Sequence, residues 1–166
     1  LGRLEEAQQG LAQVLDLRDD LGDQAGLATA WGNMGTVHAA KSEFDSAIAA
    51  WRTALEYAER TGQKPYIPAF LNNIGEAYVE MGSFALAQTA LKDARMITEE
   101  SGDLGCLADI LRNQGALTFA KGDAEGALTL VDEAIALCKQ VGSRHAMAQA
   151  LRTRGEVLGA GGGGQG

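Results

Sequence analysis

Three asparagines recur at a fixed spacing, and their side chains could bind the backbone of a peptide. Asn33, Asn73 and Asn113 are 40 residues apart, and each stands two residues before a glycine. Each carboxamide offers two N–H donors and an oxygen acceptor. A column of such groups could hydrogen-bond an extended peptide whatever the side chains of that peptide are. Plainer roles stay open, because an Asn in a helix can cap locally, bond a neighbouring repeat's backbone or persist through duplication.

The sequence carries no constellation typical of catalysis or of a bound cofactor. Its glycines are not followed by the Gly-Lys-Ser/Thr of a phosphate-binding loop. No Ser or Cys stands in a nucleophile motif, and His38 and His145 have no triad context. Cys106 and Cys138 have no His at metal-ligand spacing, and we expect both to be small buried residues. We therefore expect a non-catalytic protein with no cofactor and no metal site.

Charge and hydropathy exclude several classes of partner. The 166-residue chain has a net charge of −8 and a pI near 4.7. Non-specific nucleic-acid binding needs a basic face, so we expect no nucleic-acid partner. No apolar run is long enough to span a bilayer and no signal-peptide pattern is present, so we expect no membrane partner. With only two cysteines, the expected location is cytoplasmic.

The chain repeats itself every 40 residues, and four blocks align without a gap. One alanine series and two glycine series keep this spacing without a break. They are Ala7, Ala47, Ala87 and Ala127; Gly22, Gly62, Gly102 and Gly142; and Gly35, Gly75, Gly115 and Gly155.

Each block is expected to contain two helices. Apolar residues over 69–81 and over 83–100 recur at the three- and four-residue spacing of a helix with one buried stripe. A left-handed glycine can end each helix, and a following Ser or Asp can cap the next one. The expected junctions are Gly82–Ser83, Gly122–Asp123, Gly62, Gly102–Asp103 and Gly142–Ser143, with Pro65 and Pro68 in a first turn.

Glycines inside the first helix of each block require a packing reason, because Gly in a helix costs up to ~1 kcal/mol relative to Ala. We expect the second helix to approach closely at these positions. A larger side chain would hold the two backbones apart. The expected contacts join Gly35, Gly75 and Gly115 to Ala47, Ala87 and Ala127, and Trp31 and Trp51 are expected in the same seam.

This pattern resembles the tetratricopeptide repeat (TPR). Trp31-x-x-Met34-Gly35-x-x-His38, Ala47-x-x-x-Trp51 and then Ala54 is similar to the TPR signature, and later blocks repeat it more loosely. The usual period is about 34 residues. Here Glu59, Glu99 and Lys139 replace the usual helix-ending Pro, so the second helix can continue. HEAT repeats share a 40-residue period but not this Gly–Ala pattern.

The resemblance implies an all-α, right-handed superhelical solenoid of antiparallel helix pairs, with about eight helices. It covers a TPR domain at 1–158, with a flexible glycine-rich tail at 159–166. The expected parts of the domain are half repeat 1–24, repeats 25–64, 65–104 and 105–144, and half repeat 145–158. Long repeats of this kind resemble those of bacterial signalling ATPase regulators, kinesin light chains and bacterial peptide-pheromone receptors. The excess of Ala and Arg over Ile and Lys favours the bacterial regulators, and the initial Leu indicates a piece of a longer protein.

The two ends are expected to show apolar surface, because each carries half a repeat and no polar capping element. These ends would meet further repeats in a longer parent, or would pair with another copy. The apolar residues concerned are Leu4, Leu11 and Leu15 at one end and Leu151 and Leu158 at the other.

The resemblance also implies that the first helices line a concave groove. Asn33, Asn73 and Asn113 would face that groove, with Thr153 at the same position in the last block. In related peptide-binding TPR domains, an Asn at this place holds the backbone of the peptide.

Charged residues beside this stripe would select the ligand. Arg112 and Arg152 could grip a carboxylate, although single arginines are more often solvated or salt-bridged. Acidic residues would favour basic groups on the ligand. They are Glu76, Glu80, Asp109 and Glu156.

Two functions remain open. The first is a non-catalytic scaffold whose groove holds a peptide or a segment of a partner protein. The alternative is a structural or autoinhibitory sensor arm of a larger bacterial regulator, with no ligand in the groove. A small-molecule inducer is a third possibility, but a shallow superhelix seldom encloses such a ligand.

Overall fold

The structure is a computed structural model that describes residues 2–162, and these residues form eight α-helices and one short 3-10 helix. The predicted all-α fold of about eight helices is therefore confirmed. No helix within this part of the chain is long and apolar enough to cross a membrane. The elements are α1 Gly2–Asp20, α2 Gln24–Ala40, α3 Phe44–Thr61, η1 Lys64–Tyr66, α4 Ile67–Glu80, α5 Phe84–Ser101, α6 Leu104–Ala120, α7 Ala124–Val141 and α8 Arg144–Gly162.

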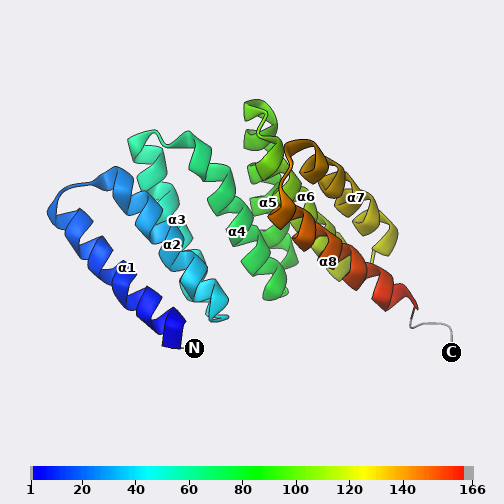
Figure 1. Ribbon diagram of the computed structural model, residues 1–166, viewed down its shortest axis with the longest axis horizontal. Helices are drawn as coiled ribbons and strands as arrows, with labels where there is room; N and C mark the ends of the chain where they lie inside the picture. The colour runs from blue at the N-terminus through cyan, green and yellow to red at the C-terminus, as the bar shows by residue number, and fades with distance from the viewer. Residues whose placement is uncertain (1, 163–166) are drawn as a thin grey trace.

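Consecutive helices pack as antiparallel pairs that follow one another across the molecule (Figure 1). α2 packs on α3, α4 on α5 and α6 on α7, while α1 and α8 lie at the two ends of the row. The first helices of the later pairs also touch one another, since α4 contacts α6 and α6 contacts α8. α2 and α4 make no contact of that extent.

Left-handed glycines end the second helices, as predicted. Gly62, Gly102 and Gly142 have φ angles of 71°, 73° and 72°. Glycine adopts this conformation readily because it has no Cβ. Ser42 has a φ of 59° at the position where later blocks have Gly82, and it is the one non-glycine residue of positive φ in the described chain.

Three of the four predicted caps form hydrogen bonds to helix N-termini. Asp103 accepts from the backbone N–H groups of Gly105 and Cys106, and Asp123 accepts from that of Gly126. The Ser143 hydroxyl accepts more weakly from Ala146, with an N···O distance of 3.3 Å. The fourth predicted cap does not form.

That fourth cap is Ser83, which makes no side-chain capping bond to α5. The backbone still closes this junction, because the N–H of Ser83 donates to the carbonyl of Tyr78 at 2.9 Å. The serine hydroxyl is therefore not required to end α4 or to start α5.

The glycines inside the first helices do face the second helix, but the side chains that cover them stand four residues after the alanines that the sequence indicated. A Cβ added at Gly115 would lie 2.6 Å from Cγ2 of Val131 and 3.2 Å from the carbonyl oxygen of Ala127. Helical side chains point towards the N-terminus of their helix, so the contacting residue comes one turn after the closest backbone. The contacts join Gly35 to Trp51, Gly75 to Leu91 and Gly115 to Val131.

Two aromatic side chains, Phe70 of α4 and Trp51 of α3, pack around Gly32 of α2. A Cβ at Gly32 would lie 2.5 Å from Cε1 of Phe70, so the Phe70 ring rests on the backbone of α2. The Trp51 indole N–H donates to the carbonyl of Gly32 at 3.0 Å. Trp51 is buried in the seam as predicted, while Trp31 is only partly buried.

The two end helices expose apolar side chains, but on α1 these are not the ones that the sequence indicated. No residue of α1 is buried: the predicted Leu4, Leu11 and Leu15 are partly buried, while Leu17 is exposed. On α8, Leu151 and Leu158 are about half exposed. The predicted last helix ended at Leu158, whereas α8 continues to Gly162. Extending an existing helix costs far less than starting one, so weak helix formers can join its end. The rest of the predicted flexible tail, 163–166, lies outside the described residues.

Candidate functional site

The predicted asparagine column lies on the first helices but meets three different environments. We call the surface formed by α2, α4, α6 and α8 the inner face. Asn33 on α2 is exposed, Asn73 on α4 is half-buried, and Asn113 on α6 is fully buried. Thr153 on α8 is also buried, and its hydroxyl donates to the carbonyl of Gln149 within its own helix. The difference follows the spacing of the helices, since α6 contacts both α4 and α8.

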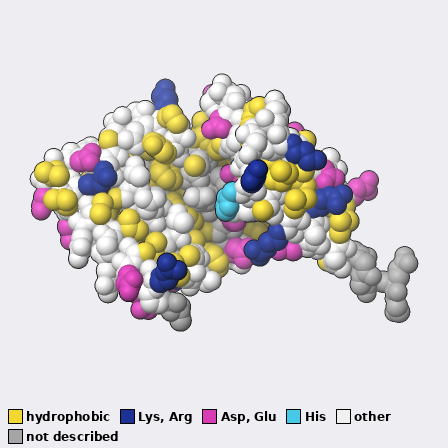
Figure 2. Space-filling view, in the orientation of Figure 1, with side chains coloured by type: hydrophobic (Ala, Val, Ile, Leu, Met, Phe, Trp, Pro, Cys, Tyr) yellow, Lys and Arg dark blue, Asp and Glu magenta, His cyan; other side chains and the backbone are white. Residues whose placement is uncertain are grey.

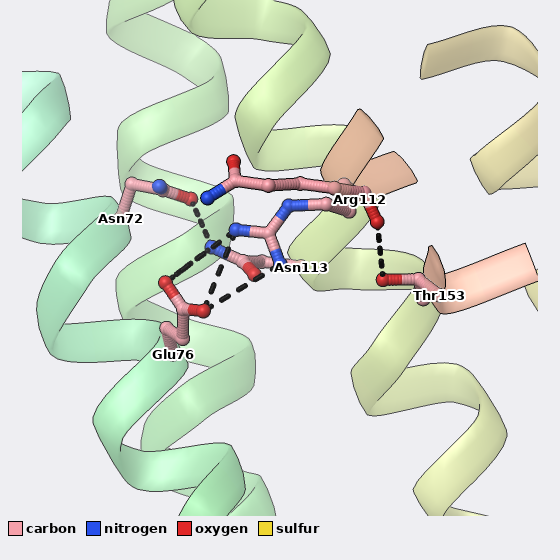
Figure 3. Close-up of polar contacts among 6 residues, drawn as sticks. Asn72, Glu76, Arg112, Asn113 and Thr153 are labelled. Carbon is pink, nitrogen blue, oxygen red and sulfur yellow. Dashed lines mark hydrogen bonds and ion pairs between the residues drawn. The ribbon is translucent and has the colours of Figure 1, made fainter. Parts of the chain in front are cut away.

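A polar cluster joins α4 to α6 around Asn113 (Figure 3). The Asn113 amide nitrogen donates to Oδ1 of Asn72 at 3.0 Å and to Oε2 of Glu76 at 3.4 Å. Arg112 approaches the same Glu76 carboxylate, with its nearest nitrogen–oxygen distance at 3.4 Å. Asn72 and Asn113 are both buried, so their hydrogen bond satisfies groups that would otherwise be costly to bury. Asn113 thus has a structural contact between repeats.

The guanidinium of Arg112 is largely buried but incompletely bonded. Its side chain is 12 % exposed, and its Nε has no hydrogen-bond partner among the described residues. On the next turn of α6, burial raises the pKa of Asp109, Arg112 opposes that shift, and Glu76 adds to it. Burial therefore disfavours the charged form of Asp109, and the positive charge of Arg112 offsets this effect only in part.

A first pocket lies between α2 and α4, with α3 beneath it. It encloses about 400 Å³. Figure 2 shows a hollow near the middle of this face, where apolar side chains gather. The residues that line the first pocket are Thr36, Ala39, Ala40, Phe44, Trp51, Asn73, Glu76, Ala77 and Glu80.

A second pocket lies between α4, α6 and α8, and it is smaller and more polar. It encloses about 160 Å³. Arg152 lies at its edge and pairs with Glu156 at 2.9 Å, in a solvent-exposed bridge. Its lining residues are Glu76, Val79, Glu80, Arg112, Asn113, Ala116, Gln149, Arg152, Thr153 and Glu156.

The two pockets adjoin, because Glu76 and Glu80 line both. Eight of the ten predicted site residues therefore lie along one strip of the inner face, and two do not. Asn33 and Asp109 line neither pocket. The eight are Asn73, Glu76, Glu80, Arg112, Asn113, Arg152, Thr153 and Glu156.

Two features of this strip were not predicted. Asn72 was not among the predicted site residues, yet it is the acceptor that fixes Asn113. The apolar floor formed by Phe44 and Trp51 was also missed. A signal for the space above this floor was available in the alignment of the blocks, since Ala39 and Ala77 are replaced by larger residues 40 positions later.

The strip has the chemistry of a binding surface. Amides, carboxylates and guanidinium groups can form hydrogen bonds and ion pairs with a partner, and the first pocket can bury an apolar group. Among the described residues, no group of three or more His, Cys, Asp or Glu side chains is placed to hold a metal ion.

Comparisons with known proteins agree with this architecture. Residues 26–100 match the family model described as tetratricopeptide repeat. A search of curated proteins found no match. The structure is similar to several crystal structures at low sequence identity.

Two of these solved structures illustrate the likeness. The crystal structure of BtubC (BKLC) from P. vanneervenii aligns with a TM-score of 0.67 at 14 % identity, covering 97 % of this chain and 82 % of that one. TPR-like repeats from Podosopora anserina, nearly identical to one another and assigned to a kinesin light chain, align with a TM-score of 0.64 at 15 % identity. That alignment covers 99 % of this chain and 82 % of the other. The chain therefore has the TPR-like solenoid fold.

Proposed function

We propose that this chain is a non-catalytic scaffold whose inner face holds an extended peptide or a segment of a partner protein. The observation that carries the proposal is the continuous strip formed by the two adjoining pockets across α2, α4, α6 and α8. Along this strip, amide and carboxylate groups can bond a peptide backbone, and the apolar floor of the first pocket can take a side chain.

The asparagines have unequal roles in this proposal. Asn73 lines the first pocket, and its side chain makes no hydrogen bond to the described residues, so it can turn to a ligand. The Asn113 amide N–H groups already donate to Asn72 and Glu76. Asn113 therefore mainly links α4 to α6. Asn33 is exposed and lies outside both pockets. We therefore propose that Asn73 contacts the peptide backbone. Asn33, at the aligned position outside the pockets, serves as the control residue.

The proposal is tested by selecting binders from a displayed library of random linear peptides and comparing three proteins. The affinity of a selected peptide is measured for the wild type, for Asn73→Ala and for Asn33→Ala. A hydrogen bond contributes about 0.5–1.5 kcal/mol net, so Asn73→Ala should weaken binding by roughly 3- to 10-fold. Asn33→Ala should bind as the wild type does.

The alternative, a structural or autoinhibitory arm with an empty inner face, makes a different prediction. It expects no peptide to be selected, or binders for which Asn73→Ala and Asn33→Ala are equivalent. Under that alternative the polar cluster around Asn113 serves stability alone. The assignment to a bacterial regulator and the cytoplasmic location stay predictions.

A second proposal concerns self-association, and an open position on α8 favours it. Nothing lies within 4 Å of a Cβ added at Gly155, whereas the aligned Gly115 is covered by Val131. Leu11 on α1 occupies the position aligned with Val131, and it could cover Gly155 of a second copy. We propose that the 166-residue chain pairs head to tail in this register.

Sedimentation at increasing protein concentration tests the pairing. The wild type should show a growing average mass. Gly155→Leu should abolish that growth, because the new side chain would fill the space on α8 that Leu11 of the second copy would occupy. A Cβ at this position meets no other atom of its own chain within 4 Å. A wild type that stays monomeric at all concentrations contradicts the proposal.

A further inference from the structure

The first pocket exists because its walls are alanines where the later blocks have larger residues. The wall position on the earlier helix is Ala39 here, and the wall position on the later helix is Ala77. Each larger side chain removes space between successive first helices, so only the α2–α4 junction combines two small walls. The aligned residues in the next two blocks are Val79 and Phe119 for the earlier helix, and Leu117 and Val157 for the later one.

The floor of the first pocket is aromatic and is held in place. Trp51 is 4 % exposed, and its indole N–H is fixed by the bond to the carbonyl of Gly32. Phe44 is partly buried beside it. A pocket of about 400 Å³ with such a floor has room for one bulky apolar side chain.

The rim of the first pocket is acidic on the α4 side. Glu80 is exposed there and forms no salt bridge with the described residues. Glu76 meets Arg112 only at 3.4 Å, a long contact that leaves 45 % of its side chain exposed. The rim can therefore attract a cation on a ligand.

The lysine that directly follows α2 is already bonded to other residues. Lys41 follows α2 directly, but its ammonium donates to Gln8 of α1 and pairs with Glu43 at 2.9 Å. His38 contacts the same Glu43 carboxylate at 2.6 Å. These two partners lower the pKa of Glu43, with Lys41 the larger cause. Neither basic group neutralises Glu80.

We propose that the first pocket binds a bulky apolar side chain of a partner segment, and that a neighbouring Lys or Arg of the same segment binds at the Glu76–Glu80 rim. The inference rests on the proposed function, because it names the ligand chemistry of the same inner face. It adds that the α2–α4 junction, rather than the whole strip, selects the partner.

Four short synthetic peptides test the ligand chemistry on the full chain. Each carries Phe or Ala at its centre, with either two Lys or two Glu beside it, in an otherwise identical Gly/Ser sequence. Binding is followed by polarisation of a fluorescent label on the peptide. The peptide with Phe and Lys should bind most tightly, and replacing Phe by Ala should weaken it about 10-fold or more, the loss expected for one buried aromatic side chain.

Residues from the next block provide matched protein variants. Ala39→Val with Ala77→Leu rebuilds the α2–α4 junction with the side chains of Val79 and Leu117, and it should weaken the Phe–Lys peptide about 10-fold or more. Ala85→Leu, at an exposed position on α5, is the control and should bind as the wild type does. Glu80→Gln should reduce the preference for Lys over Glu about five-fold at low salt, the effect of one ion pair in water.

The outcomes separate this inference from the proposed function. Equal binding of all four peptides, no measurable binding of any, or unchanged binding to the filled-pocket variant would overturn the inference. If library-selected peptides still lose affinity in Asn73→Ala while the filled pocket has no effect, the scaffold function stands and the pocket assignment is wrong. If both variants bind those peptides as the wild type does, both proposals fail. Circular dichroism of each variant confirms that its helices are retained.

Discussion

The close contact at Gly115 predicts that Gly→Ala changes the free energy of unfolding in opposite directions at two aligned glycines. A methyl group at Gly115 would lie 2.6 Å from Cγ2 of Val131 and 3.2 Å from the carbonyl oxygen of Ala127. Val131 is fully buried and β-branched, so it cannot rotate away easily, and a backbone carbonyl cannot move alone. Overpacking of this kind costs about 1–3 kcal/mol, while Gly→Ala inside a helix returns up to about 1 kcal/mol. We expect Gly115→Ala to lower the free energy of unfolding by about 1–2 kcal/mol.

Gly155 is the matched control, because it is the same residue 40 positions later on α8. Nothing lies within 4 Å of its added Cβ, so Gly155→Ala should raise the free energy of unfolding by up to about 1 kcal/mol. Urea unfolding followed by circular dichroism measures both changes. A second substitution, Val131→Ala, should be less harmful in Gly115→Ala than in the wild type, because the pair is then no longer overpacked.

Stabilisation by Gly115→Ala, or equal effects at the two glycines, would refute the reasoning about this contact. The helix pairs would then be spaced by something other than the bare backbone of the first helix. The recurrence of glycine at this position would also lose its physical explanation.

Three further predictions concern single residues. Ser42→Gly should raise the free energy of unfolding by about 0.5–1 kcal/mol, because Ser42 has a φ of 59° and glycine relieves that strain; thermal unfolding measures it. Asn113→Ala should lower the unfolding free energy by about 1–3 kcal/mol in urea, because Asn72 loses a buried partner, while the exposed Asn33→Ala should change it by less than about 0.5 kcal/mol. For Asp109, whose pKa is raised by burial, the folded state binds a proton more tightly than the unfolded state, so the destabilisation from its charge is present at neutral pH and is lost as pH falls through the raised pKa. Asp109→Asn should therefore be more stable than the wild type at pH 7, and this advantage should vanish below the ordinary pKa of 3.8 in an unfolding series against pH.

Local signals in the sequence were sufficient to predict the helix pairs. A left-handed glycine followed by a capping Asp acts through its immediate neighbours, so junctions such as Gly102–Asp103 form where predicted. The sequence did not predict which residue of the second helix covers each glycine of the first helix. The alanine at the right distance along the second helix is not the residue that covers the glycine, because side chains lean one turn towards the N-terminus.

The environment of each asparagine could not be predicted from its spacing. Asn33, Asn73 and Asn113 share one position in their repeats, yet their burial increases along the chain. Burial here depends on how closely successive first helices approach, and that distance follows from residues elsewhere, such as the Phe70 ring resting on α2. A periodic pattern identifies the face of a helix, but it does not determine how near the next helix lies.

The first pocket was predictable in principle from side-chain volume. Aligning the blocks shows Ala77 where the next block has Leu117, and a smaller residue at a junction leaves space. The α8 extension was not predictable in this way. Gly159 and Gly162 are poor helix formers, and they join α8 because an existing helix precedes them.

Mapping of a bound peptide by NMR tests the central claim most directly. Backbone and side-chain amide shifts of the labelled chain are recorded while a library-selected peptide is added. The account predicts that the largest changes cluster at the Trp51 indole N–H, the Asn73 side-chain amide and the Glu76–Glu80 turn of α4. Changes confined to α3, α5 and α7 away from these pockets, or to the exposed ends on α1 and α8, would contradict a partner held on the inner face.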